Sequence, residues 1–448
     1  TWVRTLPLRA IADEIEHGLR FLASSLRDMP TRHRSMSAVF DHSWRLLSPR
    51  ERSILRQLAV FRGGCTRVAA AAVSGATLAD LADLVDKSWL RLRADERYQM
   101  HELVRQYCEE KLDAEHAQCD GERSNQVRSR HCAYFAGMTG TQEEQAYNWQ
   151  DEAMALLRAD FGNLEMAWHW ALAQEDTTAT QQMMNALFFF AEMTGWFDAM
   201  LPFFFQATRT LRTRRPPADV AVTKRQNDTL LQVNLLYIQV VLWMHLGRLT
   251  CAQASLAEMQ ALLASVAERE YYPHYLARWA SASLARAFGN FVEAQAMARD
   301  LLVFLEQNCF PCYPWRTEIG TRFLQMHMHA LIGFTARLLG DYPTAWRHSE
   351  RAANLSDEMG EQRFKANTLQ EIAVLWRLRG EYEQARTVAQ RGLALSQRFE
   401  DRISAAYGEL TLGQIEIDAG QLTLAGAYCQ RSLAVALETG EHALLIRS

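Results

Sequence analysis

The sequence lacks the features that mark membrane and secreted proteins. No run of about 18 uncharged apolar residues occurs, so neither a membrane-spanning helix nor a membrane partner is predicted. The eight cysteines are scattered, and no signal peptide precedes them, which is typical of a protein kept in the reducing cytoplasm. The first residue is Thr1 and not methionine, which predicts that the chain is a piece of a longer protein.

Excess charge and catalytic motifs are missing as well. Lysine is rare and the formal net charge is −4, so no overall attraction to nucleic acid or anionic lipid follows. The phosphate-binding pattern G-x-x-x-x-G-K-[ST] is absent, as are H-E-x-x-H, G-x-S-x-G and a glycine-rich dinucleotide loop. The sequence therefore predicts a chain that is not an enzyme, holds no cofactor and does not hydrolyse ATP.

One cysteine pair, Cys309 and Cys312, has the spacing of a metal or redox site. A tetrahedral zinc site needs two more ligands. The nearby His327 and His329 are two residues apart on a predicted helix, so they cannot face one point. We interpret the pair as two cysteines in an inserted loop and predict no metal site; a redox-sensitive disulfide is the alternative.

The first 118 residues combine short helices with a β signal. Residues 1–33 predict an amphipathic helix, ended by Met29-Pro30-Thr31. Ser48, Pro49 and Glu51 form the start of a helix that Gly63-Gly64 stops. The other expected elements are helices over 37–47, 68–73, 78–89 and 101–112, and strands over 90–93 and 97–100. Helices followed by a β hairpin are the plan of a winged helix, which we place at residues 34–118.

Beyond residue 120 an internal repeat dominates. Six glycines, 40 to 52 residues apart, each have an aromatic residue or Leu two positions later and a small or apolar residue five positions later. The glycines are Gly195, Gly247, Gly289, Gly340, Gly380 and Gly420; the second positions are Phe197, Leu249, Phe291, Tyr342, Tyr382 and Leu422; the third are Met200, Ala252, Ala294, Ala345, Ala385 and Ala425. We expect the glycine to permit a tight turn, the second residue to plug the gap between two helices, and the third to let them approach.

The segment LGDYPTA at 339–345 resembles the core of a tetratricopeptide repeat, although the period near 40 exceeds the usual length of about 34. This resemblance predicts a mainly α fold, in which residues 191–448 form a right-handed α-α superhelix of tetratricopeptide-like repeats. Residues 119–190 are interpreted as degenerate linking or capping helices. The concave face of such an array is expected to bind a protein, a peptide or a small effector.

Five blocks in the first third carry a second resemblance. They are TRHRSMS at 31–37, FDHSWRLL at 40–47, LAVFRGG at 58–64, LVDKS at 84–88 and MHELVRQY at 100–107. In this order they are similar to the winged-helix region of STAND-class regulatory ATPases, the NB-ARC-containing relatives of plant resistance proteins and of bacterial activators. The resemblance covers roughly residues 1–190. It implies an ATPase domain upstream, ADP or ATP in the intact parent, and residues 1–33 as the tail of a helical domain.

His101 is the site residue that this resemblance singles out. The family's Met-His-Asp motif implies that His101 contacts the ADP β-phosphate in the intact parent, although Glu102 replaces the Asp. The start of a helix also favours an anion, because its N–H groups are unpaired and its dipole is positive there. The alternative is a solvated histidine at a helix entry.

DNA binding by the winged helix is the competing interpretation. A recognition helix brings Arg or Lys to the phosphates. Here Asp80, Asp83 and Asp86 lie on one face, so nucleic acid is not the expected partner. Arginines on the predicted wing are the counter-argument; they are Arg91, Arg93 and Arg97.

The function that we predict is therefore a sensor arm of a STAND signal-transduction protein. Ligand in the repeats would change how they pack on the winged helix, which would relay the change to the ATPase. The alternatives are a passive protein-binding scaffold and a DNA-binding transcriptional activator.

Overall fold

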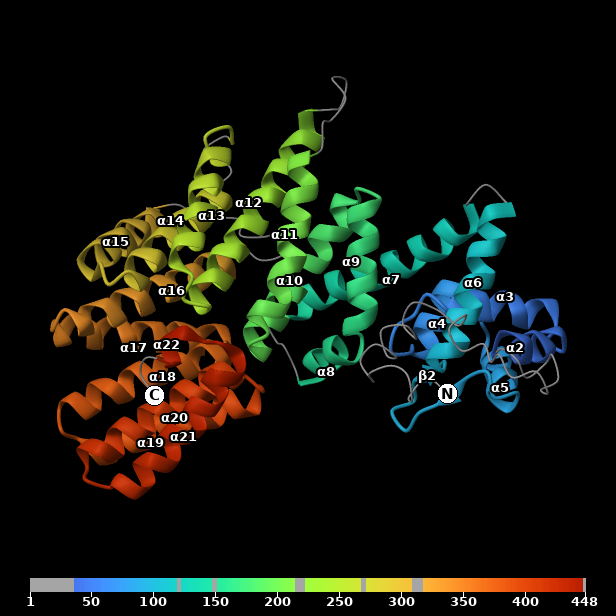
Figure 1. Ribbon diagram of the computed structural model, residues 1–448. Coiled ribbons are helices and arrows are strands. Elements are labelled where there is room, and N and C mark those ends of the chain that lie inside the picture. The colour runs from blue at the N-terminus through green and yellow to red at the C-terminus, as the bar shows by residue number, and fades with distance from the viewer. Residues whose placement is uncertain are drawn as a thin grey trace, which may run out of the picture. The chain divides into compact units, whose positions relative to one another are not determined.

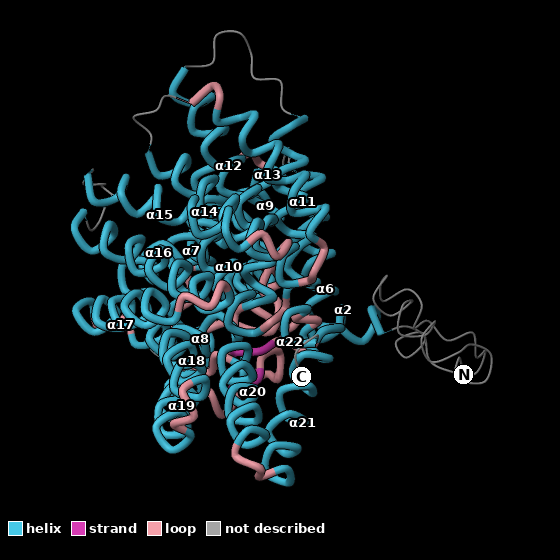
Figure 2. The backbone as a smooth tube through the Cα atoms, turned by 90° about the vertical axis from the view of Figure 1, so that its left-hand side faces the viewer, coloured by secondary structure: helices cyan, strands magenta, loops and turns pink. Residues whose placement is uncertain are grey.

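The computed structural model describes residues 36–118, 122–146, 151–213, 222–266, 271–307 and 317–445. Helices make up most of these residues, and Figure 2 shows one short pair of strands among them. The predicted fold class is confirmed: a winged helix precedes helices that resemble tetratricopeptide-like superhelical repeats. The helix predicted over 1–33 and the pair Cys309 and Cys312 lie outside the described residues.

The chain divides into two compact units. One consists of Thr1–Gly140 and Ala155–Met183, and the other of Thr141–Met154 and Met184–Ser448. Part of the predicted linking segment 119–190 thus belongs with the winged helix. Among the described residues no single helix is long and apolar enough to cross a membrane; α4 and α5 reach that length and composition only as a bent pair.

The winged helix occupies the first unit (Figure 1). Its elements are α2 Met36–Arg45, α3 Pro49–Leu58, α4 Arg67–Ser74, α5 Leu78–Asp86, β1 Arg91–Leu92, β2 Tyr98–Gln99 and α6 Glu102–Gln118. Local signals set these bounds. The Ser48 hydroxyl accepts from Glu51 N–H at 3.2 Å and the Glu51 carboxylate accepts from Ser48 N–H at 2.7 Å, which is the predicted capping box. Gly75, at φ 69°, ends α4.

The wing is confirmed, with shorter strands than predicted. Arg91 pairs with Gln99 and Leu92 with Tyr98 in an antiparallel register. Cys65 adds a bridge on the other side of Tyr98, with backbone hydrogen bonds of 2.9 and 2.8 Å, and this third segment was not predicted. The predicted helix 78–89 ends earlier, at Asp86, because Ser88 adopts a positive φ of 59°.

Three further helices, α7 Glu122–Ala146, α8 Asp151–Ala159 and α9 Phe161–Ala173, follow the winged helix. The repeat helices come next. They are α10 Thr177–Thr194, α11 Phe197–Thr213, α12 Val222–His245, α13 Leu249–Leu263, α14 Tyr271–Ala287, α15 Phe291–Gln307, α16 Thr317–Leu338, α17 Tyr342–Met359, α18 Gln362–Leu378, α19 Tyr382–Arg398, α20 Arg402–Asp418, α21 Leu422–Thr439 and α22 His442–Leu445. From α11 to α21, neighbours in the chain pack on each other (Figure 1).

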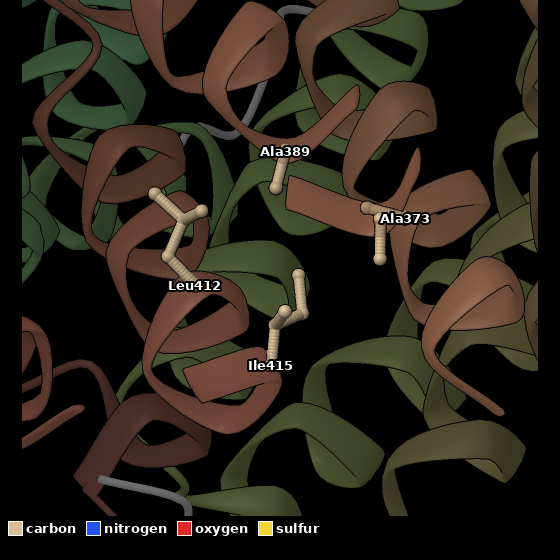
Figure 3. Packing of buried hydrophobic residues seen from close by; sticks show 5 residues of the cluster. Ala373, Ala389, Leu412 and Ile415 are labelled. Carbon is tan, nitrogen blue, oxygen red and sulfur yellow. The ribbon is translucent and has the colours of Figure 1, made fainter. Parts of the chain in front are cut away.

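Each repeat glycine stands between the two helices of a pair. All six have φ between 67° and 83°, a region that a side chain makes costly. The small or apolar residue five positions on is buried in every repeat. In the repeat that begins at Gly380 this residue is Ala385, and it belongs to one buried cluster with Ala373 of α18, Ala389 of α19, and Leu412 and Ile415 of α20 (Figure 3).

The prediction for the second repeat position is wrong in part. Phe197 is buried, but Tyr342 is 49% exposed and Leu422 is 70% exposed. In every pair this residue is the first of the second helix. It therefore lies at the end of a helix pair. Its burial depends on which side chains of neighbouring helices cover it and not on the turn itself.

Candidate functional site

The helix-turn-helix face of the winged helix is the first candidate surface. Helices α4 and α5 meet at 105°, within the range of about 90–120° for this motif. The outer side of α5 exposes Asp83 and Asp86. Asp80, the third acid of the predicted stripe, is instead paired with Arg50 at 2.7 Å and caps α5 through Thr77. The face is thus less acidic than the sequence indicated, yet it has no row of cations.

The wing arginines divide into two kinds. Arg91 and Arg93 are exposed. Arg97 is 5% exposed, and its guanidinium donates to the Asp160 carboxylate at 2.5 and 3.1 Å and to the Gly64 carbonyl at 3.2 Å. Arg97 is therefore a structural contact between the wing and the start of α9, and it is not available to a phosphate.

Asn163 of α9 completes this buried junction. Its amide nitrogen donates to Gly64 O at 3.0 Å and to Asp160 Oδ1 at 2.8 Å, and its amide oxygen accepts from Arg62 N–H at 2.7 Å. His131 of α7 packs beside it against Phe61, with ring centroids 5.1 Å apart. Burial lowers the pKa of His131 to about 4, so the ring is neutral at pH 7. The junction thus binds α7 and α9 to the winged helix through a set of fully buried polar groups.

His101 lies where the sequence placed it, immediately before α6, and is exposed. Its Nδ1 accepts from Leu103 N–H at 3.3 Å, so it acts as a cap for α6. Glu102, which departs from the family motif, pairs with Arg105 at 2.6 Å. Its nucleotide contact stays a prediction.

The second candidate site lies in the repeats, where the last helices return to the first. His245, at the end of α12, is held between two carboxylates: its Nε2 is 3.1 Å from Glu192 of α10, and its Nδ1 is 2.5 Å from Glu441, just before α22. The ring of Phe197 stacks on His245 with centroids 4.3 Å apart. Burial alone would lower the pKa of His245, but the two carboxylates outweigh it and raise the pKa to about 10. His245 is therefore a cation at neutral pH.

We call Glu192, His245 and Glu441, together with the side chains that contact them, the repeat latch. Further contacts lie around these three residues. Tyr407 of α20 donates to Glu441 at 3.2 Å. Arg363, at the start of α18, has its guanidinium 4.6 Å from the Phe189 ring centroid and 5.3 Å from that of Phe399. Segments some 200 residues apart in the chain are thus joined by charges and rings.

Two repeat glycines lie against the latch. A Cβ on Gly195 would come 2.5 Å from Thr439 Cγ2, and a Cβ on Gly247 would come 2.3 Å from His442 Cγ. A Cβ on Gly289, Gly340, Gly380 or Gly420 would meet nothing within 4 Å. Gly195 and Gly247 therefore have two roles. Each permits a turn, and each leaves room for a helix to approach, α21 at Gly195 and α22 at Gly247.

A shallow cleft of about 260 Å³ lies between α13 and α14, with His274 and Arg278 on its wall and no acidic residue among those that line it. Among the described residues no group of three or more His, Cys, Asp or Glu could hold a metal. His327 and His329 do diverge, since His327 bonds Phe323 O at 2.9 Å and His329 faces His348 at 2.9 Å.

The family comparison agrees with the winged-helix elements. Residues 47–113, from before α3 into α6, match the model of a winged helix-turn-helix domain. Proteins of Mycobacterium bovis and of two Mycobacterium tuberculosis strains, provisionally named HTH-type transcriptional regulators, are 29% identical over 216 residues. The match covers 44% of this chain and 24% of each relative, so the chain accounts for about a quarter of their length.

Solved structures resemble the chain more loosely. A STAND protein with a tetratricopeptide repeat sensor from Pyrococcus horikoshii matches with a TM-score of 0.45 and 14% identity, over 98% of this chain and 68% of that one. BtubC from P. vanneervenii gives 0.40 and 12%, over 55% and 93%, and a Rap protein complexed with Competence and Sporulation Factor gives 0.39 and 11%, over 69% and 99%.

The comparisons do not support the prediction that nucleic acid is an unexpected partner, because the winged-helix model and the relatives' names both belong to helix-turn-helix proteins. They leave the NB-ARC resemblance and the cytoplasmic location as predictions. Sequence reasoning missed Asp160, Asn163, Glu192, His245 and Glu441. Apart from the contact between Asp160 and Asn163, their partners lie too far away in the chain for any local pattern to reveal them.

Proposed function

We propose that this chain is the regulatory and sensor part of a larger signalling protein, with repeats that bind a protein, a peptide or a small effector. The repeat latch carries this proposal. A sensor needs two arrangements that differ by a few kcal/mol, and a ligand shifts them only if it binds one more tightly than the other. An ionic contact between the two ends of an array supplies such a difference. It adds a specific stabilisation to the closed form that a ligand in the open form must outweigh.

The winged helix has the role of relay in this proposal. Within the first unit, Arg97 joins it to the start of α9 through Asp160 and Asn163, and His131 of α7 packs beside Asn163. An event in the repeats would reach this unit through the helices that connect the two. In the intact parent it would alter an ATPase domain, where the exposed His101 would contact the phosphates of ADP. The motif resemblance supports that last step.

Hydrogen exchange on the intact chain tests the switch without knowledge of the ligand. Three segments should open together, at a free energy below that of global unfolding. They are 189–197, 243–249 and 436–445. His245→Gln keeps a polar side chain but cannot carry the charge, so it should speed exchange in all three segments and leave α16 and α17 unchanged. A passive scaffold would show no joint opening below global unfolding, and that result would refute the switch.

DNA binding is the second candidate function, favoured by the winged-helix match and by the exposure of Arg91 and Arg93. It predicts that the chain binds a duplex with an affinity that falls steeply as salt rises. Replacing Arg91 and Arg93 with Gln should then weaken binding and flatten the salt dependence. Fluorescence anisotropy with a labelled duplex of about 20 base pairs measures both.

A further inference from the structure

The exposed sides of α4 and α5 carry several apolar side chains. Val68 of α4 is 60% exposed and Leu78 of α5 is 58% exposed. Four alanines of the same two helices are exposed as well: Ala71, Ala72, Ala79 and Ala82. An exposed apolar surface rimmed by polar groups marks a place where another protein docks.

The spacing of these residues fits a helix. Val68 and Ala72, and likewise Leu78 and Ala82, are four residues apart, so each helix presents a ridge along its outer side. The alanines are short enough to let a third backbone approach. Only residues 75–77 separate α4 from α5, and the two helices meet at 105°, so the two ridges lie on adjoining helices.

Most charged residues near this surface that are exposed and have no ion pair within the described part of the chain are acidic. Asp83 and Asp86 are exposed and make no ion pair with any described residue. The adjacent cations are already in use: Lys87 pairs with Glu51 at 2.5 Å and Arg50 with Asp80 at 2.7 Å. The exposed Arg67, at the start of α4, is the exception.

We propose that the α4–α5 face docks a basic amphipathic helix of a partner protein. Apolar side chains of that helix would cover Val68, Leu78 and the alanines, and its Lys or Arg residues would pair with Asp83 and Asp86. A duplex on this face would bring its phosphates to the two aspartates and its bases to aliphatic side chains, so the docking of a basic helix competes with the second candidate function for this face. The surface belongs to the winged helix, so it is a second binding site beyond the repeats.

A designed peptide tests the proposal on the full chain. The probe is a fluorescent peptide of about 18 residues with leucines on one helical face and lysines on the other, and the comparison peptide has glutamates in place of the lysines. We expect the lysine peptide to bind with a Kd on the order of 10 μM and the glutamate peptide not to bind. Leu78→Ser should weaken binding about tenfold. Val292→Ser, at a 70% exposed residue of the repeats, is the matched control and should change nothing.

Charge reversal separates this docking from unspecific attraction. The double variant Asp83→Lys and Asp86→Lys should lose the lysine peptide and gain the glutamate peptide. Both residues lie in the last half of α5, where a cation suits the helix dipole, so the variant should fold. Binding of either peptide that ignores Leu78→Ser overturns the proposal. So does duplex binding that Leu78→Ser abolishes, or a dimer of this chain that the same variant dissociates.

Discussion

Gly195 and Gly340 offer a matched test of the repeat latch. Both have positive φ, of 74° and 81°, so alanine at either costs about 1–2 kcal/mol from the left-handed backbone alone. At Gly340 nothing lies within 4 Å of the new Cβ. At Gly195 the Cβ would meet Thr439 Cγ2 at 2.5 Å and Ile403 Cδ1 at 3.2 Å, and overpacking of this kind costs about 1–3 kcal/mol more. We therefore expect Gly195→Ala to destabilise the repeats by the larger amount.

Hydrogen exchange in increasing urea measures the two costs, since it reports the free energy of opening for each segment. In Gly195→Ala the extra loss should concentrate in α21 and α22, which lie far away in the sequence. Thr439→Ser removes only the Cγ2 that clashes and keeps the hydroxyl, so it should restore part of the stability in the double variant. Equal costs for Gly195→Ala and Gly340→Ala, without rescue by Thr439→Ser, would show that α21 does not pack on this turn.

Three further changes test the buried groups. Asp160→Ala leaves the guanidinium of Arg97 buried without its carboxylate, so it should lower the free energy of unfolding by about 3–5 kcal/mol, and adding Arg97→Met should recover part of this loss. Hydrogen exchange of the β1 and β2 amides measures the change, and a loss under about 1 kcal/mol would refute the pairing. His131 has a folded pKa near 4, so its stabilisation is complete above the unfolded pKa of about 6.5 and is lost as pH falls toward 4. In His131→Gln the stability of α7 should fall less between these two pH values, and an unchanged pH dependence would contradict this prediction. The pH dependence of stability is opposite for His245: its folded pKa is about 10, so the stabilisation by the latch is complete below about pH 6.5 and is lost as pH rises through 10. His245→Gln should lose about 1.5–3 kcal/mol of stability at neutral pH and show no such pH dependence.

The elements of the winged helix were predictable because each one has a local cause. A capping box at Ser48, a glycine after α4 and an alternating pair of strands are read from a few neighbouring residues. The end of α5 was misjudged because Ser88 takes a positive φ that serine rarely adopts. The bridge from Cys65 to Tyr98 joins residues 33 apart and had no local signal.

The repeats were predictable for the same reason, but the sites were not. Glycine at each turn and a small residue five positions later are local requirements, and they recur. His245 and Glu441 are 196 residues apart, so no local sequence pattern near either residue predicts their contact. Gly195 and Gly247 were selected for their turns, and the approach of Thr439 and His442 to them is a tertiary fact that the repeat pattern hides.

The chemistry of the two junctions also bears on what kind of molecule this is. Replacing a buried ion pair with well-packed apolar residues is often neutral or stabilising, so stability alone does not explain the pair of Arg97 with Asp160 or of His245 with Glu441. Such pairs fix one arrangement, because a shift of a few ångström leaves a charge unpaired in a poor solvent. In the junction around Arg97 both charged partners are buried, so opening this contact would leave two charges away from water. In the latch, where Glu192 is part-exposed at the edge, water can reach a charge once the contact opens, which lowers the cost of opening. The same kind of contact thus favours a fixed joint in one unit and a reversible one in the other.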